Sequence, residues 1–293
     1  MPHSNKERQS NIGNALEKII GPRAGSTEMV DTRHDNTVGL RRFEYEDGVI
    51  ARSVEAREQI QRMAQPFVFS REELARNHII VQGDENEEAL TLLKDLRNRI
   101  TLKQAALGAT ILVTTIGEPR GASILARNLA AIISTDESRT SLLLEAQDTD
   151  AELHDKSQNA TGLYDFLNSD TLSVADVIHP TGIPRMRVIP FGEAQSINFD
   201  YLRSTRMRIL IKDVTRRYPR DRFTVIDAPP VDKVADVELL NEYADIIVLC
   251  IPYGKVTLAD AKRGIAKLDK TKLLGTVLLG TPRLPATFKK FAQ

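Results

Sequence analysis

A glycine-containing loop lies between an apolar run and an amphipathic stretch near the middle of this 293-residue chain. The apolar run 109–113 leads into the loop 114–123, and the amphipathic stretch 124–133 follows it. A strand, a loop and a helix in this order place backbone N–H groups and a helix N-terminus around a phosphate group. Such loops end Gly-Lys-Ser/Thr, whereas this one ends Gly121-Ala122-Ser123. Because alanine can neither donate to a phosphate nor offset its charge, we expect a nucleotide-binding architecture that lacks a central part of its chemistry.

Two acidic residues terminate apolar runs farther along the chain. The run 142–144 leads into Glu145, and the run 223–226 leads into Asp227. In open α/β sheets, ligands bind beyond the carboxyl ends of the parallel strands. If both runs are strands of one parallel sheet, the two acids and the loop 114–123 lie at the same edge of that sheet. The pattern therefore predicts one site that is assembled from three separate segments.

The segments that position this site alternate between apolar runs and helical patterns from Ala109 onward. The runs are nearly continuous, as is typical of parallel strands that helices cover on both faces. Repeated strand–helix units with right-handed crossovers give a doubly wound α/β fold. We therefore predict a mostly parallel, P-loop NTPase-like sheet with a helical N-terminal extension. Strands are expected at 109–114, 141–144, 187–190, 223–227, 246–251 and 273–280, and helices near 124–134, 162–168, 200–218, 235–243 and 257–270.

The composition is that of an ordinary globular protein and argues against several classes of function. Lys and Arg number 40, which equals the 40 Asp and Glu, so net charge gives no reason to expect nucleic acid as a partner. The single cysteine, Cys250, lies in an apolar run, and the five histidines show no metal-ligand spacing. No apolar run approaches the roughly 20 residues that a membrane helix needs. We expect a cytoplasmic protein that is peripheral at the inner membrane only through a partner.

Residues 1–69 differ in character from residues 70–293, and we predict a domain boundary between them. The first part is highly charged and contains one short amphipathic pattern, Ile12 to Ile20, which Gly21-Pro22 terminates. A helix this short is marginal alone, so its apolar face packs on the main domain or on another protein, or the segment is disordered. The second part opens with a capping box, Ser70 to Glu73, and a further helix is expected from about residue 84.

The order of these elements, from about residue 70 to about residue 280, resembles the bacterial tyrosine autokinases of exopolysaccharide and capsule synthesis. These kinases are P-loop proteins related to the MinD/ParA ATPases. The segment Asn128-Leu129-Ala130 matches the helix that follows the family's phosphate loop, and Asp227-Ala228-Pro229 matches its third motif. Gly162 to Leu167 matches a helix start farther along. No single motif is decisive, but their collinear order is specific.

The resemblance implies a role for each residue that matches a family motif. It implies a nucleotide site for ATP or ADP, a Mg²⁺ site and a pair of catalytic acids. The implied nucleotide-binding residues are Gly117, Arg120, Gly121 and Ser123, the implied Mg²⁺ ligands are Ser123 and Asp227, and the implied catalytic acids are Asp227 and Glu145.

The chain departs from the family pattern at residues that the chemistry requires. Pro119 replaces a loop glycine and removes an N–H donor, and Ala122 replaces the lysine. Gln147 replaces an acid of the second motif. Arg120 lies two residues before the missing lysine, and it either reaches a phosphate from outside the loop or is a solvated surface side chain. Family kinases carry a C-terminal tyrosine cluster, whereas no tyrosine follows Tyr253 in this chain.

Two sets of residues are candidates for protein contacts. The family's ring-forming motif, Glu-x-x-Arg-x-x-Arg, falls on Thr91, Lys94 and Arg97, so the glutamate is absent and assembly into a homo-oligomer stays open. Arg216 and Arg217 belong to a basic helix face, which is either solvated or docks an acidic partner. Such a partner would be the cytoplasmic tail of a membrane polysaccharide co-polymerase or another export protein.

These departures predict a pseudokinase with at most trace activity, in which binding of ATP/ADP and Mg²⁺ is weak or lost. We expect a non-catalytic or weakly active regulator or adaptor of exopolysaccharide or adhesin-polysaccharide synthesis and export. Two alternatives stay open: an active tyrosine autokinase that uses Arg120 and Glu145, and a MinD/ParA-like positioning ATPase. The positioning ATPases need a lysine early in the loop, where this chain has Ile116-Gly117-Glu118, so this alternative is the least favoured.

Overall fold

The computed structural model describes residues 63–80, 87–103, 108–148, 153, 161–193, 199–217, 222–234 and 237–281. The chain divides into two units, Met1–Val54 and Glu55–Gln293, and all described residues belong to the second unit. The short helix predicted at Ile12 to Ile20 lies outside the described residues. The domain boundary expected between residues 69 and 70 stays a prediction.

A seven-stranded sheet forms the centre of the described part, in the order β3-β4-β2-β5-β1-β6-β7. Every neighbouring pair is parallel except β3 and β4, which are antiparallel. The mostly parallel doubly wound sheet expected from the apolar runs is therefore confirmed. The strands are β1 Thr110–Thr115, β2 Thr140–Glu145, β3 His179–Pro180, β4 Met186–Ile189, β5 Arg222–Asp227, β6 Ile246–Pro252 and β7 Leu273–Leu279.

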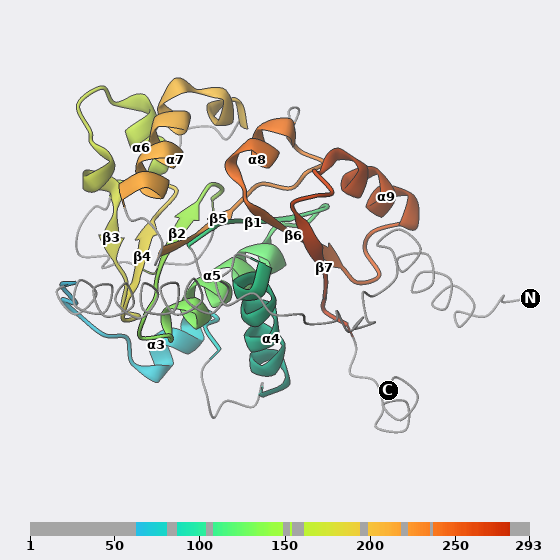
Figure 1. The fold of residues 1–293 in the computed structure, drawn as a ribbon, viewed down its shortest axis with the longest axis horizontal. Coiled ribbons are helices and arrows are strands. Elements are labelled where there is room, and N and C mark those ends of the chain that lie inside the picture. The colour runs from blue at the N-terminus through green and yellow to red at the C-terminus, as the bar shows by residue number, and fades with distance from the viewer. Residues whose placement is uncertain are drawn as a thin grey trace, which may run out of the picture. The chain divides into compact units, whose positions relative to one another are not determined.

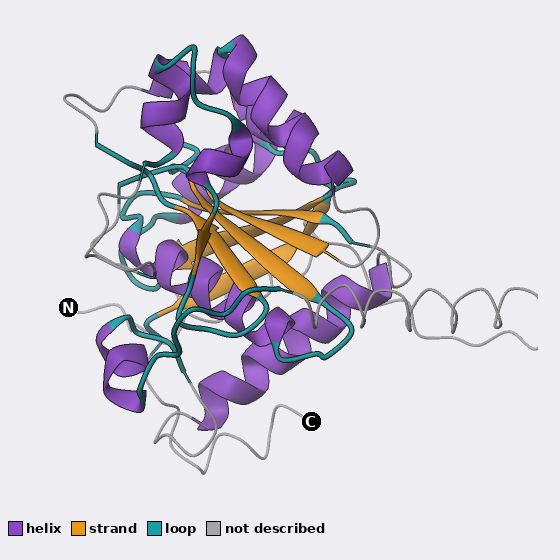
Figure 2. Ribbon diagram, turned by 90° about the vertical axis from the view of Figure 1, so that its left-hand side faces the viewer, coloured by secondary structure: helices purple, strands orange, loops and turns teal. Residues whose placement is uncertain are grey.

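Helices cover both faces of this sheet (Figure 1). Seen edge-on, α3, α4 and α5 lie below the strands, and α6, α7, α8 and α9 lie above them (Figure 2). The α-helices are α3 Arg71–Arg76, α4 Glu87–Lys103, α5 Arg120–Ser134, α6 Leu163–Asn168, α7 Thr205–Arg217, α8 Val237–Tyr243 and α9 Leu258–Lys267, and two 3₁₀ helices span Val174–Val177 and Phe199–Arg203.

The core sits between α5 and the central strands. Strands β1, β2 and β5 are buried along their whole length, which explains why their sequences are apolar runs without alternation. Helix α5 buries a broad stripe that includes Ala126, Leu129 and Ile133, and this stripe packs on the sheet. The fold thereby fixes the loop between β1 and α5 at the carboxyl ends of the central strands.

Local sequence signals agree with the observed helix starts. Ser70 Oγ accepts a hydrogen bond from the Glu73 backbone N–H, and the Glu73 carboxylate accepts one from the Ser70 N–H, so the predicted capping box begins α3. In the part of the chain that the structure describes, no helix combines the length and the apolar character needed to traverse a lipid bilayer.

Candidate functional site

The strand register brings three predicted segments to one edge of the sheet. Glu145, the last residue of β2, lies beside Asp227, the last residue of β5, and Asp227 also lies beside Val113 of β1. The loop between β1 and α5 follows two residues after Val113. Both acids are buried. The structure thus places Glu145, Asp227 and the loop together at the carboxyl edge, where α/β proteins bind ligands.

The loop is folded so that its N–H groups bond to oxygens of the protein itself. Gly117 adopts a φ of 82°, a left-handed conformation that favours glycine, and its N–H donates to Asp232 Oδ1 at 2.9 Å. Helix α5 begins directly after Pro119, whose carbonyl oxygen accepts from the Ala122 N–H at 2.9 Å and from the Ser123 N–H at 3.1 Å. The Gly117 and Ala122 N–H groups are therefore engaged internally, whereas the Ser123 N–H makes the ordinary first α-helical hydrogen bond of α5.

The position of the missing lysine is closed to solvent. Ala122 is fully buried and belongs to the hydrophobic cluster between α5 and the sheet. Arg120, by contrast, is exposed at the first residue of α5. Gly121 is half-buried, and a Cβ atom there would lie 2.7 Å from Leu279 Cδ1, so this glycine allows α5 to approach β7 closely. Ala122 and Gly121 therefore both take part in packing α5 against the sheet. For Gly121 this is in addition to the nucleotide-binding role that the resemblance implies.

The amide of Gln147 connects the two residues that were expected to bind Mg²⁺. Its Nε2 donates to Asp227 Oδ1 at 2.7 Å and to Ser123 Oγ at 3.1 Å. Because an ionised carboxylate only accepts hydrogen bonds, the amide nitrogen rather than its oxygen faces Asp227. All three side chains are buried. Sequence reasoning treated Gln147 as a lost acid and missed its role as the donor that holds this cluster together.

Asp227 has an unusual environment for a carboxylate. Complete burial raises its pKa to about 6, and hydrogen bonds from Ser123 and Gln147 together with the charge of Arg127 oppose this rise. Tyr201 lies nearby and is buried, and its hydroxyl donates to the Ala146 carbonyl oxygen. Burial followed by the charge of Asp227 raises the pKa of the Tyr201 hydroxyl, so this group stays neutral.

A buried arginine faces the second acid. Arg127 Nε lies 3.6 Å from Glu145 Oε1, and only 5% of each side chain is exposed. This separation makes an ion pair rather than a hydrogen bond. Sequence reasoning missed Arg127, although an arginine among Leu125, Ala126 and Leu129 on an apolar helix is a detectable signal. The charge of Glu145 is thus balanced by the protein's own cation.

The described residues do not fit a Mg²⁺ ion well. Mg²⁺ is held by oxygen ligands in octahedral geometry, whereas an amide nitrogen of Gln147 points at both candidate ligands, Ser123 and Asp227. Among the residues that the structure describes, no group of three or more His, Cys, Asp or Glu side chains is arranged to hold a metal. Asp227 Oδ2, by contrast, is buried without a hydrogen-bond partner among the described residues, so one carboxylate oxygen at this edge is left over.

The residues considered for protein contacts lie away from this cluster. Lys94 is exposed on α4, and Arg97 is half-buried there with its Nη1 donating to Thr135 Oγ1 at 3.4 Å. Arg216 and Arg217 end α7, and their side chains lie outside the described residues. The structure does not bring these two pairs together with the acids at the sheet edge.

Comparison with known proteins identifies relatives of this chain. It is 24% identical over 198 residues to the tyrosine-protein kinase wzc of Salmonella typhimurium, covering 67% of this chain and 27% of that protein. It is 26% identical over 195 residues to the putative tyrosine-protein kinase EpsB of Ralstonia solanacearum, covering 66% of this chain and 25% of that protein. It is 24% identical over 186 residues to the tyrosine-protein kinase CpsD of Streptococcus agalactiae, covering 62% of this chain and 79% of that protein. The chain therefore spans about a quarter of the length of the first two relatives.

Solved structures show the same fold. The BceF tyrosine kinase domain is 26% identical with a TM-score of 0.52, covering 65% of this chain and 76% of that domain. The kinase domain of Escherichia coli tyrosine kinase ETK is 19% identical with a TM-score of 0.56, covering 77% of this chain and 87% of that domain. No protein-family model matches the chain. The homologues of this protein are bacterial tyrosine-protein kinases, and its fold is that of their kinase domains.

Proposed function

We propose, starting from this homology to bacterial tyrosine-protein kinases, that the protein is a non-catalytic or weakly active kinase-like regulator. It acts as an adaptor in exopolysaccharide or adhesin-polysaccharide synthesis and export. The observation that carries the proposal is the internal bonding of the loop: the Gly117 N–H bonds to Asp232 Oδ1 and the Ala122 N–H to the Pro119 carbonyl oxygen. A triphosphate that uses these two N–H groups has to displace both hydrogen bonds.

The interactions with the phosphates that this chain lacks are worth enough free energy to suppress phosphoryl transfer. Phosphoryl transfer depends mainly on positioning and on neutralising charge. A charge-assisted hydrogen bond contributes about 1.5–3 kcal/mol, and each loss of about 1.4 kcal/mol lowers a rate tenfold. Ala122 supplies no cation, Pro119 no N–H group and Gln147 no carboxylate. Together these changes lower the expected rate by several orders of magnitude, and they leave the binding of ATP or ADP and of Mg²⁺ weak or absent.

The proposed partner is a membrane polysaccharide co-polymerase or another export protein. The resemblance to capsule and exopolysaccharide kinases supports this, and it also supports a cytoplasmic position that is peripheral at the inner membrane through the partner. The proposed contact residues are Arg216 and Arg217 for an acidic tail, and Lys94 and Arg97 for a homo-oligomer. Equal numbers of basic and acidic residues, 40 of each, give no support for a nucleic-acid partner.

Isothermal titration with ATP and Mg²⁺, together with phosphotyrosine detection on the purified protein, tests the proposal. We expect no saturable heat at micromolar ATP and no phosphotyrosine signal. The Asp227→Asn variant is the matched control, because it removes the one carboxylate that a Mg²⁺ ion would require. Robust autophosphorylation that Asp227→Asn abolishes would overturn the proposal.

One observation favours a second candidate, an active tyrosine autokinase. Arg120 is exposed at the start of α5, where its guanidinium has room to reach a phosphate from outside the loop. A rigid, planar guanidinium is not a simple replacement for lysine, so we rank this function second. The same titration separates the two, since Arg120→Ala would abolish activity only if Arg120 supplies the missing cation.

A further inference from the structure

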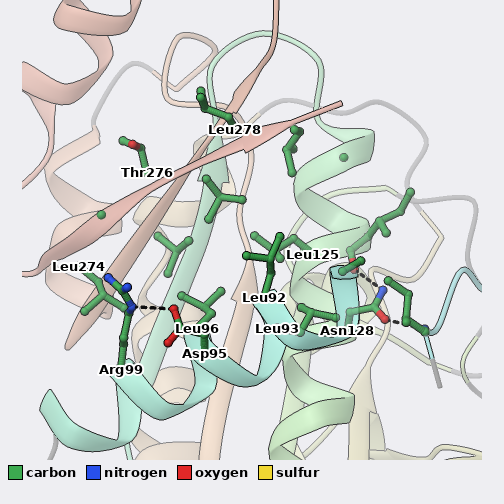
Figure 3. Close-up of a pocket in the computed structure, with 18 of the residues that line it drawn as sticks. Leu92, Leu93, Asp95, Leu96, Arg99, Leu125, Asn128, Leu274, Thr276 and Leu278 are labelled. Atoms are coloured by element: carbon green, nitrogen blue, oxygen red, sulfur yellow. Dashed lines mark hydrogen bonds and ion pairs between the residues drawn. The ribbon is translucent and has the colours of Figure 1, made fainter. Parts of the chain in front are cut away.

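An apolar groove of about 490 Å³ runs between α4, α5 and β7 (Figure 3). Leucine side chains from all three elements point into it, and Asp95 is its single acidic side chain. One of these leucines, Leu92 of α4, is unusually exposed and retains 65% of its accessible surface. An apolar surface of this kind normally contacts another segment or another molecule. The leucines that line the groove are Leu92, Leu93, Leu96, Leu125, Leu274, Leu278 and Leu279.

The wall of the groove that β7 provides is also an edge of the sheet. In the described part of the chain, β7 is the last strand in the order and pairs with β6 alone. Its sequence, Leu-Leu-Gly-Thr-Val-Leu-Leu, contains neither a charged residue nor a proline. Edge strands usually carry such residues, or are covered, because an apolar edge invites pairing with other chains. Strand β7 therefore needs a cover.

We propose that the segment following β7 in this same chain, residues 284–291, is that cover. This segment lies outside the described residues and contains three large apolar side chains, Leu284, Phe288 and Phe291. It begins within five residues of Leu279, the end of the wall that it would cover. The proposal is independent of the proposed function, since an active kinase and an adaptor could both have the groove closed in this way.

The turn at the end of β7 supports a return of the chain toward the groove. Gly280 has a φ of 70°, and a Cβ atom added there would meet nothing within 4 Å. Packing therefore does not require this glycine, whereas the left-handed backbone does. A left-handed residue directly after a strand changes the direction of the chain, and Pro282 follows two residues later.

Reach and charge are compatible with this occupant. An extended chain spans at most about 3.5 Å per residue, so the segment can follow the whole length of β7. A short tether gives a local concentration in the millimolar range, which favours an intrachain occupant over a free partner. Asp95 at the groove pairs with Arg99 at 2.9 Å, and both residues line it, so the charges there are balanced and do not oppose Lys289 or Lys290.

The absence of tryptophan from the sequence allows a direct test in the full chain. In the variant Phe288→Trp, the single indole would report whether position 288 is buried. We expect a blue-shifted emission maximum and a several-fold lower acrylamide quenching constant than in the unfolded protein. Adding Leu92→Asp should return both values to those of an exposed indole. Leu92 is largely exposed, so this substitution should leave the fold intact, which circular dichroism would check.

A matched control and a second reporter make the result decisive. Leu102→Asp changes the most exposed leucine of α4, with 82% of its surface accessible, and Leu102 does not line the groove. This control should leave the blue shift unchanged. The variant Phe291→Trp is a second reporter, needed in case the larger indole does not fit at position 288. Emission typical of a solvent-exposed indole in both Phe288→Trp and Phe291→Trp would overturn the proposal. A blue shift that disappears on dilution would also overturn it, because the occupant would then be a second copy of the chain.

Discussion

Asp227 is the acidic residue at the site whose pKa the folded structure changes most. Burial raises its pKa from an ordinary value near 3.9 to about 6. The folded-state pKa lies above the unfolded value, so the native state binds the proton more tightly. The contribution of this group to stability is therefore greatest below about pH 4 and is lost as the pH rises to about 6. The total loss is on the order of 3 kcal/mol.

Replacing Asp227 with asparagine should remove this pH dependence. Asparagine keeps an oxygen that accepts from Gln147 but carries no charge to desolvate. We expect Asp227→Asn to be as stable as the wild type near pH 4 and more stable at pH 7 by up to about 3 kcal/mol. Urea unfolding at several pH values between 4 and 7.5 measures the difference. A variant that is less stable than the wild type at pH 7 would show that a cation or another group balances Asp227.

The buried pair Arg127–Glu145 predicts a strong dependence of each partner on the other. Arg127→Met leaves Glu145 buried without the cation that faces it, a change that typically costs about 3–5 kcal/mol of the free energy of unfolding. The double variant Arg127→Met with Glu145→Leu removes both charges and should recover most of that loss. A thermodynamic cycle from urea unfolding measures the coupling. A loss in the double variant that equals the sum of the losses in Arg127→Met and Glu145→Leu would mean that the pair contributes nothing.

The positions of the two acidic residues could be predicted from the sequence, but the side chains that contact them could not. Glu145 and Asp227 were placed because each ends an apolar run, and parallel strands bring such ends together. The donor role of Gln147 and the burial of Arg127 depend on side chains from different elements meeting in space. Periodicity along one segment carries no information on such contacts.

Helix α5 also holds the segment between α3 and α4 in place, through the side chain of Asn128. The side chain of Asn128 accepts from the Ile80 N–H at 2.8 Å and donates to the His78 carbonyl oxygen at 2.7 Å. Asn128 thereby ties the chain between α3 and α4 to the underside of the sheet. The resemblance to the kinases gave this residue only as a motif match, and the structure shows its mechanical role.

Asn128→Leu should loosen this attachment. Leucine has a similar volume but removes the partner of one partly buried N–H and of one carbonyl oxygen, at a cost of about 1 kcal/mol. We also expect faster hydrogen exchange at Ile79 and Ile80 than at the centre of α5. Ser70→Ala is a useful comparison, because it removes only the exposed cap of α3 and should cost about 1 kcal/mol without changing exchange at Ile80. Unchanged exchange in Asn128→Leu would contradict the assigned role.

Element types were predictable where apolar patterns were long. All six predicted strands and the helices near 124–134 and 257–270 are present. Strand β3, His179–Pro180, was missed because two residues are too short for any pattern and its partner β4 is antiparallel. The start of α5 was also hidden, since Pro119 and Arg120 were interpreted as loop residues rather than as the cap and first turn of a helix.

For the molecule as a whole, the fold is that of bacterial tyrosine kinase domains, and apolar residues pack closely around the loop between β1 and α5. Ala122 lies within the core cluster between α5 and the sheet, and Leu279 of β7 packs against Gly121 beside it. Packing around the loop has therefore adapted to a small residue. A single reverse substitution should not restore the chemistry, because a lysine there would have to enter a closed apolar region.

Ala122→Lys tests this adaptation of the whole domain. Burying an ammonium group without a partner is expected to lower the free energy of unfolding by several kcal/mol, and ATP with Mg²⁺ should not raise the midpoint of thermal unfolding. The control Ala175→Lys, at an exposed alanine, should change stability by less than about 0.5 kcal/mol. A restored site would behave differently: ligand at about ten times its dissociation constant stabilises by about 1.4 kcal/mol, which raises the midpoint by about 2–4 °C. Such a rise in Ala122→Lys, with near-wild-type stability, would show that the cradle is still open and lacks only its lysine.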